Sequence, residues 1–419
     1  MPHLCGAIND PRPVLEPHLA TRDAALSAMK EFAPRMGRRY ANGRNYDRGA
    51  GQHRDVSSLS PWVRRRLVTE KELIATALKH HGPEEAEKFI QEVIWRSYFK
   101  GWLERRPSIW SDYVAAVQAQ TERAAQDRKL RKQLADAEAG QTGLDCFDAW
   151  ARELVDTGYL HNHARMWFAS IWIFTFGLPW QMGADFFYRH LLDGDPASNT
   201  CSWRWVAGLH TRGKFYEAKA WNIAKFTENR FAPRDTDLAV ISAGLQDCEP
   251  HGLPEVQPLR SVIAPQSDRP TALLLTEEDC SVADFDPTSL DIVCAARLSS
   301  SHLRSPSPTS DRVAAFEATA LADTAVRLGI DTDEMTAGAP SDLARWCTRA
   351  GATQIAMPYV TTGPLSDWMA QARPSLDASG ITVTEWRHDW DELIWPNATA
   401  GFFKVKKAIP NYLHKAGLT

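Results

Sequence analysis

The chain has 419 residues, of which 44% are hydrophobic and 24% are charged, and its formal net charge is -4. These values are typical of a folded protein of two or three domains, and they exclude a disordered chain or a uniformly basic nucleic-acid coat. Basic residues concentrate in 35–44 and 64–66, so a contact with nucleic acid would need a local basic patch. The seven cysteines include no C-x-x-C pair, which predicts no metal site and favours a reducing, cytoplasmic compartment.

Helical periodicity dominates the first part of the chain. Phe89, Val93 and Ile94 recur at helical spacing, and the pattern predicts an all-α domain over residues 1–234. Within it we expect one exposed, charged helix over 120–140, ending at Gly140. Residues 166–184 carry no charge but are interrupted by Gly177 and Pro179, so we interpret them as one buried core helix rather than a membrane span.

The rest of the sequence predicts a proline-rich linker followed by an α/β domain. Five prolines fall between 250 and 270, and we place the linker at 235–268. Short apolar runs at 271–276, 290–296, 354–360 and 381–386 alternate with helical patterns at 312–329, 343–351 and 365–376. This alternation predicts a Rossmann-like parallel sheet with helical crossovers in residues 269–419. Neither half contains a common glycine-rich phosphate loop.

Polar residues gather in the stretch "LLDGDPASNTCSWRWVAG" at 191–208 and in "HNHARM" at 161–166. Arg165 and Asp193 are a natural charge-assisted pair, and Asn162 and Asn199 offer hydrogen-bond donors and acceptors in apolar surroundings. Such a set suits a polar heterocycle. The alternative is that the aspartates only cap a turn, a role that aspartate often fills beside glycine and proline.

Three ordered motifs, "HNHARM", "LLDGDPASN" and "SWRWVAG", resemble the flavin-binding core of the photolyase and cryptochrome family. Further upstream, "SSLSPW" at 57–62, "EVIWRSYF" at 92–99 and "GQTGLDCFDAW" at 140–150 are similar to other motifs of that family. The resemblance covers about residues 50–231. It implies an α-helical, FAD-binding domain of the photolyase type, followed here by the C-terminal α/β domain.

The resemblance also implies which residues bind FAD. Hydroxyl and backbone groups of Ser57, Leu59 and Ser60 would meet the diphosphate, with Arg96 beside the cofactor. Asn162, Arg165 and Asp193 would surround the isoalloxazine ring. Asp195 would accept a hydrogen bond from the ring or the ribityl chain, and Asn199 would lie near flavin N5.

The tryptophans divide into two roles by the same resemblance. Trp203 and Trp180 match two members of an electron relay to excited flavin, whereas the position of the third member falls in the polar segment 124–129, so the third residue is not identified. Trp95 and Trp205 match rings that stack on an extruded lesion. Glu92 matches a carboxylate that contacts the lesion, Asn162 and Met166 resemble the enzymes that act on cyclobutane dimers, and Lys219 stands where a phosphate-binding arginine is common.

Three functions remain open from the sequence. The first is light-driven electron transfer from reduced flavin to a cyclobutane pyrimidine dimer in damaged DNA. The second is a blue-light photoreceptor that signals to a protein partner without repair. The third is a flavoprotein that acts on a small molecule, with a second site in the α/β domain. An antenna chromophore is not specified by the sequence, and no membrane contact is expected.

The order of the domains departs from the family, whose members begin with the α/β domain. Residues 384–413 faintly resemble the end of that α/β domain and the exit from it. The chain would then be a circular permutant, a rearrangement that is tolerated where termini lie close together at the surface. The alternative is an unrelated doubly wound domain placed after a photolyase-type helical domain.

Overall fold

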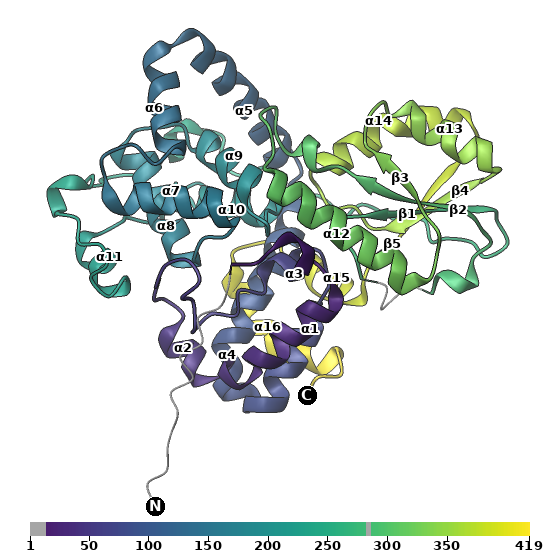
Figure 1. Ribbon diagram of the computed structural model, residues 1–419, viewed down its shortest axis with the longest axis horizontal. Helices are drawn as coiled ribbons and strands as arrows, with labels where there is room; N and C mark the ends of the chain where they lie inside the picture. Colours follow the sequence, from purple (N-terminus) through teal and green to yellow (C-terminus); the bar gives the residue numbers. More distant parts are fainter. Residues whose placement is uncertain (1–13, 282–285) are drawn as a thin grey trace, which may run out of the picture.

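The computed structural model describes residues 14–281 and 286–419. The first part of the chain is helical, as the periodicity predicts (Figure 1). Its helices are α1 (Arg22–Phe32), α2 (Arg38–Gly43), α3 (Ser60–Arg64), α4 (Glu70–Glu104), α5 (Ser108–Gln126), α6 (Arg128–Glu138), α7 (Asp145–Thr157), α8 (Asn162–Ser170), α9 (Trp180–His190), α10 (Pro196–Val206) and α11 (Ala220–Phe226). Among the described residues, no helix is long and apolar enough to cross a membrane.

Helix α4 is the longest of these helices, and it packs against α2 and α10. It begins with a capping box in which Thr69 and Glu72 bond each other's backbone N–H groups. Gly82, which has a φ of 68°, and Pro83 kink it in the middle. Its second half carries the predicted site residues 92–96 and packs against α10.

Two predicted helices are each divided in the structure. The prediction of a single helix over 120–140 is wrong. The Asp127 side chain accepts hydrogen bonds from the backbone N–H groups of Lys129 and Leu130, so α6 begins as a helix separate from α5. The single core helix expected over 166–184 is also wrong. A π-helical turn at Ile171–Thr175 and a break at Gly177, which has a φ of 64°, separate α8 from α9.

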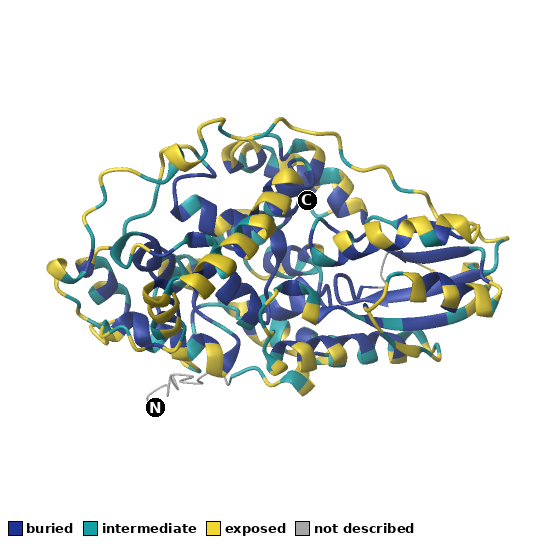
Figure 2. Ribbon diagram, turned by 90° about the horizontal axis from the view of Figure 1, so that it is seen from above, coloured by how far each residue is buried: buried dark blue, intermediate teal, exposed yellow. Residues whose placement is uncertain are grey.

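The last part of the chain contains a five-stranded parallel sheet, which confirms the α/β prediction. Its strands lie in the order β3-β2-β1-β4-β5, and they are β1 (Thr271–Thr276), β2 (Ile292–Ser299), β3 (Asp333–Thr336), β4 (Gln354–Pro358) and β5 (Thr382–Trp386). Helices α13 (Ser341–Ala350) and α14 (Pro364–Ala378) cover one face, and α12 (Asp311–Leu328) covers the other. In Figure 2 strands β1 and β4 are dark blue because all of their residues are buried.

The sequence did not predict strand β3. Its residues, Asp333–Thr336, are mostly exposed and form an edge of the sheet, so they lack the apolar run that marks a buried strand. After β5 the chain returns to the helical part as α15 (Asp389–Ile394) and α16 (Phe402–Lys415), both of which pack on α4. The Trp390 indole donates to Ser97 Oγ of α4 at 2.9 Å.

The three consecutive arginines after "SSLSPW" are buried, which corrects the expectation of an exposed basic patch at 64–66. Arg64 Nη2 donates to Glu278 at 2.6 Å, and Arg66 donates to Asp279 at 2.9 Å. Arg65 bonds Glu317 of α12. Glu278 and Asp279 follow β1 directly, so these ion pairs join the segment around α3 to the carboxyl end of the sheet. Burial makes such partners obligatory, because an unpaired guanidinium in the interior is very costly.

One carboxyl group beside this cluster, that of Glu277, has a pKa raised toward neutral pH. Glu277 is buried; it accepts from the Ser300 hydroxyl, and its Oε2 has no partner among the described residues. Burial and then the neighbouring Glu317 raise the pKa of Glu277 from its ordinary value of 4.5 to about 7. The folded protein therefore binds a proton here that the unfolded chain has already released above the ordinary pKa.

Glu277→Gln should reduce the pH dependence of stability. Because the pKa of Glu277 is raised on folding, its protonated form stabilises the fold at low pH, and this contribution is lost as the pH rises through about 7. Between about pH 4.5 and pH 7 the wild-type protein should lose stability more steeply than the variant, by up to about 1.4 kcal/mol per pH unit, and above about pH 7 the two slopes should converge. Urea unfolding at several pH values measures this difference.

Glu334→Gln is the control, since the Glu334 side chain is 83% exposed on the edge strand β3. It should keep the wild-type slope. Equal slopes for wild type and Glu277→Gln would contradict the assignment of the proton to Glu277.

Candidate functional site

Side chains from three separate motifs meet at Asp193. Arg165 Nη2 donates to Asp193 Oδ2 at 3.0 Å, so the predicted pair is present. The Ser60 hydroxyl lies close enough to the Asp193 carboxylate to lower its pKa. Burial alone would raise the pKa of Asp193, but Arg165, then Arg96, then the Ser60 hydroxyl lower it below its ordinary value. The motifs at 57–62, 92–99 and 161–166 therefore converge on one ionised aspartate.

Asp195 has two functions in the fold. Its Oδ1 accepts from the backbone N–H of Ser198 at 2.8 Å and so caps α10. Its Oδ2 lies 3.2 Å from Arg64 Nε and 3.7 Å from Lys100 Nζ. Burial opposes ionisation, yet Arg64 and then Lys100 hold the pKa of Asp195 well below its usual range. The capping role that the sequence left open is present, and the carboxylate is a buried charge as well.

The sequence did not single out Lys100 or Arg64 as site residues. Lys100 lies four residues after Arg96 on α4, and residues at this spacing share one helix face. That periodicity could have identified Lys100. Arg64 could not be found in this way, because its partners come from segments far away in the sequence.

The two predicted asparagines differ in their surroundings. Asn199 is 9% exposed, and its Nδ2 donates to the backbone oxygen of Ala184 in α9 at 2.7 Å. This bond holds the side chain in one orientation. Asn162 is the first residue of α8 and is exposed, and Met166 in the next turn is partly buried. Their roles toward a flavin stay predictions.

Several buried polar atoms around Asp193 have no hydrogen-bond partner among the described residues. They include Arg96 Nη1, Asp193 Oδ1 and Ser198 Oγ. Leaving one such group unsatisfied costs about 1–3 kcal/mol, so a ligand that supplies partners is favoured at this place. The set contains a cationic donor, an anionic acceptor and a hydroxyl, which fits a ligand with phosphates and a polar ring system.

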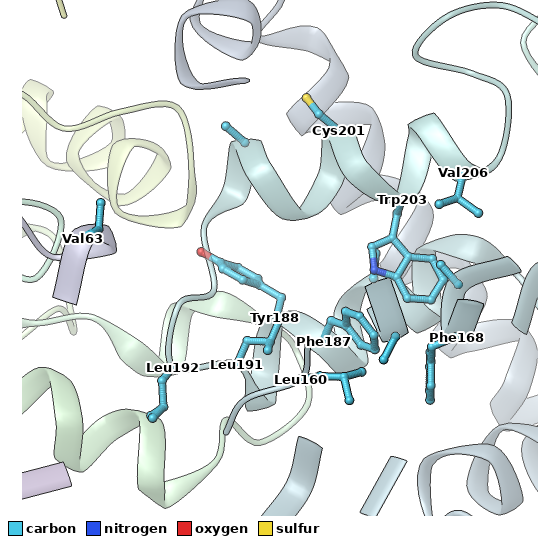
Figure 3. Packing of buried hydrophobic residues seen from close by; sticks show 14 of the residues in the cluster. Val63, Leu160, Phe168, Phe187, Tyr188, Leu191, Leu192, Cys201, Trp203 and Val206 are labelled. Atoms are coloured by element: carbon cyan, nitrogen blue, oxygen red, sulfur yellow. The ribbon is translucent and has the colours of Figure 1, made fainter. Parts of the chain in front are cut away.

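Trp203 packs against helix α9, and Trp180 is the first residue of that helix. A Cβ atom added to Gly183 would lie 2.3 Å from Cη2 of Trp203, so only glycine permits this close approach. Trp180 lies three residues earlier on the same helix and thus on the same face. Figure 3 shows the Trp203 ring among Phe187 and Phe168, and its centroid is 5.1 Å from that of Phe187. The Trp180 ring stacks on Tyr113 with centroids 5.9 Å apart.

The side chains predicted to bind substrate all contact other groups of the chain. Trp95 stacks on Phe402 of α16, with ring centroids 3.7 Å apart and planes inclined by 14°. The centroids of Trp205 and Tyr216 are 5.7 Å apart. Two ion pairs complete the set, Glu92 with Arg44 at 2.5 Å and Lys219 with Glu217 at 3.1 Å. Substrate binding at these residues would have to compete with these contacts.

One group of residues in the described structure could hold a metal ion, and the sequence did not predict it. Ligand atoms of Asp47, His53 and Glu153 lie within 4.8 Å of one another. The Asp47 carboxylate already accepts from the Trp150 indole at 2.9 Å and from Arg230 at 2.7 Å. These residues are scattered through the sequence and show no ligand spacing. We interpret the group as part of a buried hydrogen-bond network.

The comparisons with known proteins agree with this geometry. A family model described as the FAD binding domain of DNA photolyase matches residues 89–232. A deoxyribodipyrimidine photo-lyase of Streptomyces griseus is 35% identical over 157 residues, which are 37% of this chain and 33% of that protein. A chloroplastic/mitochondrial cryptochrome DASH of Ostreococcus tauri is 30% identical over 177 residues, 41% of this chain and 31% of that protein.

Among solved structures, a bacterial class III photolyase from Agrobacterium tumefaciens aligns with a TM-score of 0.40 and 24% identity, covering 50% of this chain and 43% of that chain. The chain spans only about a third of the length of the two curated relatives. Similarity alone therefore does not show that this chain has the activities of those complete proteins.

Residues 89–232 of the helical part thus match the FAD-binding domain of DNA photolyase. The similarity is to the photolyase and cryptochrome family, the family that the motifs predict. The α/β domain lies after the helical part in this chain. Circular permutation stays a prediction.

The residues at Asp193 fit FAD in their chemistry. Ser57, Leu59 and Ser60 come from the segment predicted to hold the diphosphate, and Arg96 is predicted to lie beside the cofactor. Arg165 and Asp193 come from the segments predicted to hold the ring. The unpartnered atoms Arg96 Nη1 and Asp193 Oδ1 are a donor and an acceptor, both of which an FAD molecule can satisfy.

Asp193→Asn should weaken FAD binding. The substitution removes the charge that orients Arg165, and hydrogen bonds to charged groups contribute about 1.5–3 kcal/mol. The FAD dissociation constant should rise about tenfold or more, which corresponds to about 1.4 kcal/mol. Quenching of flavin fluorescence during titration of the flavin-free protein measures it.

Asp185→Asn is a matched control, because Asp185 is also a buried carboxylate that pairs with an arginine of the helical part, Arg189, at 2.8 Å. It should bind FAD like the wild type. If both variants bound FAD as tightly as the wild type, Asp193 would not belong to the flavin site.

Proposed function

We propose that this chain binds FAD in its helical part and uses light to transfer an electron from reduced flavin to a cyclobutane pyrimidine dimer in DNA. The observation that carries the proposal is the convergence of Ser60, Arg96 and Arg165 on Asp193, with buried polar atoms left for a ligand. The match of residues 89–232 to the FAD-binding domain of DNA photolyase supports it. The names of relatives such as deoxyribodipyrimidine photo-lyase support the choice of substrate.

Bound FAD would supply the light-driven electron transfer, and the residues of the chain would set its environment. Ser57, Leu59, Ser60 and Arg96 would bind the diphosphate. Arg165 and Asp193 would orient the ring, and Asn199, fixed by its bond to Ala184, would present its amide oxygen toward flavin N5. Trp203 and Trp180 would deliver electrons from the protein to the flavin site. The dense aromatic packing around Trp203 excludes water from this path.

The substrate side would use Trp95 and Trp205 as stacking surfaces, with Glu92, Asn162 and Met166 nearby. Stacking of a base on an aromatic ring contributes about 1–3 kcal/mol. Because Phe402 covers one face of Trp95, an extruded base would bind the other face or displace α16. Lys219, at a side-chain exposure of 53%, would neutralise a DNA phosphate.

A photoreceptor without repair activity is the second candidate, and a specific observation favours it. Trp95, Trp205, Glu92 and Lys219 are all engaged within the chain, as expected where no substrate enters. In that function, photoreduction would shift a conformational equilibrium that a protein partner detects. The first step, electron transfer through Trp203 and Trp180, is common to both candidates.

The third function, a small-molecule enzyme with a second site in the sheet, is not proposed. Parallel sheets of this order bind ligands beyond the carboxyl ends of the strands, at the switch point between β1 and β4. Here Glu278 after β1 pairs with Arg64 and bonds Thr361 after β4 at 3.3 Å. Glu104 of α4 accepts from the Tyr359 hydroxyl at the same edge. Protein side chains thus fill the crevice.

A light-dependent repair assay on single- and double-stranded DNA with a cyclobutane dimer tests the enzyme function. Phe402→Ala should raise the affinity for such DNA, because it uncovers a face of Trp95. Phe403→Ala is the matched control, since Phe403 is the next residue but is 76% exposed. Repair by the wild type, with tighter binding by Phe402→Ala only, is the expected outcome.

Flavin photoreduction without repair by any of these proteins would contradict the enzyme function and favour the photoreceptor. FAD-loaded protein that shows neither repair nor photoreduction would contradict both.

A further inference from the structure

The aromatic rings beyond Trp180 form a continuous path toward the α/β domain. The Tyr113 ring of α5 stacks on Trp180 with centroids 5.9 Å apart. The Trp110 ring, one turn earlier on α5, lies 5.3 Å from Tyr113. All three side chains are buried, at 6%, 4% and 3% exposure. An electron vacancy at Trp180 therefore has two further oxidisable rings within contact distance.

The two rings differ in how they can release a proton. The Tyr113 hydroxyl is buried and has no hydrogen-bond partner among the described residues. Oxidised tyrosine is stabilised by loss of its hydroxyl proton, but none of the described residues accepts a hydrogen bond from the Tyr113 hydroxyl. The Trp110 indole N–H, in contrast, donates to Asp367 Oδ2 of α14 at 2.8 Å. Asp367 is exposed to solvent, so a proton that reaches it can leave to water.

The charges around the neighbouring rings also favour Trp110. Arg304 lies over the Tyr188 ring at 5.0 Å, and Arg106 lies over the Trp102 ring at 4.5 Å. A cation over an aromatic face makes removal of an electron from that ring harder. Trp110 has a carboxylate at its N–H group instead, and this negative charge stabilises the oxidised ring.

We propose that the electron relay of this protein ends at Trp110, with Tyr113 as a bridge and Asp367 as the proton acceptor. The inference rests on the proposed light-driven electron transfer, which generates the vacancy at Trp180. In the proposed step, Trp110 gives one electron to the Trp180 radical cation through Tyr113, and Trp180 returns to its neutral form. The Trp110 N–H bond breaks, and its proton forms an O–H bond on the Asp367 carboxylate. The products are a neutral Trp110 radical and a protonated Asp367.

This step would place the end of the relay between the two parts of the chain. Trp110 belongs to α5 of the helical part and Asp367 to α14, which covers the sheet. Photoreduction would then change the charge of one residue of the α/β domain. Because Trp110 is 3% exposed, external reductants would reach the radical slowly, and it would be long-lived.

Transient absorption and electron paramagnetic resonance of the FAD-loaded full chain test the proposal. After a light pulse the wild type should show a long-lived, deprotonated tryptophan radical. Trp110→Phe should lose this signal and return rapidly to the dark state. Asp367→Asn should instead show a protonated tryptophan radical with a shorter lifetime, because the amide cannot take up the proton. This exposed substitution also carries the test if Trp110→Phe fails to fold.

Trp346→Phe is a matched control, since Trp346 is 5% exposed and its indole donates to Asp333 at 2.9 Å in the α/β domain. It should keep the wild-type radical. Suppose that Trp180→Phe abolishes the radical while Trp110→Phe and Asp367→Asn behave as the wild type. This result would contradict the proposed end of the relay at Trp110 and leave the proposed electron transfer to flavin standing. If the FAD-loaded wild type forms no radical at all, both the proposed electron transfer and the proposed end of the relay are contradicted.

Discussion

Ion pairs of three buried arginines join the helical part of the molecule to its α/β part. Arg64, Arg65 and Arg66 are at most 6% exposed, and a buried guanidinium is tolerated only where carboxylates face it. Their partners come from the segment after β1, from α12 and from α15, and they are Glu278, Asp279, Glu317 and Asp391. Removing one partner of a buried pair typically costs about 3–5 kcal/mol, so this contact resists separation of the two parts.

The same contact determines where the chain can bind a ligand. Arg64 bridges Asp195 of the flavin motif and Glu278 at the carboxyl end of β1. The loop after β4 approaches equally closely, since a Cβ at Gly363 would lie 2.7 Å from Pro196. The switch point of the sheet is therefore used to support the "DGD" turn rather than to bind a nucleotide. The site that we propose for the ligand is the set of polar atoms around Asp193 in the helical part.

Sequence reasoning succeeded where residues close in the chain carry the signal. Strands β1, β4 and β5 and helix α12 follow from apolar periodicity, and the Arg165–Asp193 pair follows from motifs whose spacing is short. The break at Asp127 was also local, because aspartate at this position is a helix cap, but the strong periodicity on both sides concealed it.

The failures concern contacts between distant segments. Three adjacent arginines have the pattern of an exposed basic patch, and only the fold brings five buried carboxylates to them. The stacking of Phe402 on Trp95 joins residues about three hundred positions apart, and nothing near either residue indicates it. Strand β3 was missed because an exposed edge strand needs no apolar run.

Hydrogen exchange of the protein with and without FAD is the most direct measurement of the central claim, that the polar cluster at Asp193 is the flavin site. The account predicts one FAD per chain and slower amide exchange in 57–60, 161–166 and 193–199, with little change in the sheet. A folded chain that binds no FAD, or protection confined to the loops after β1 and β4, would contradict it.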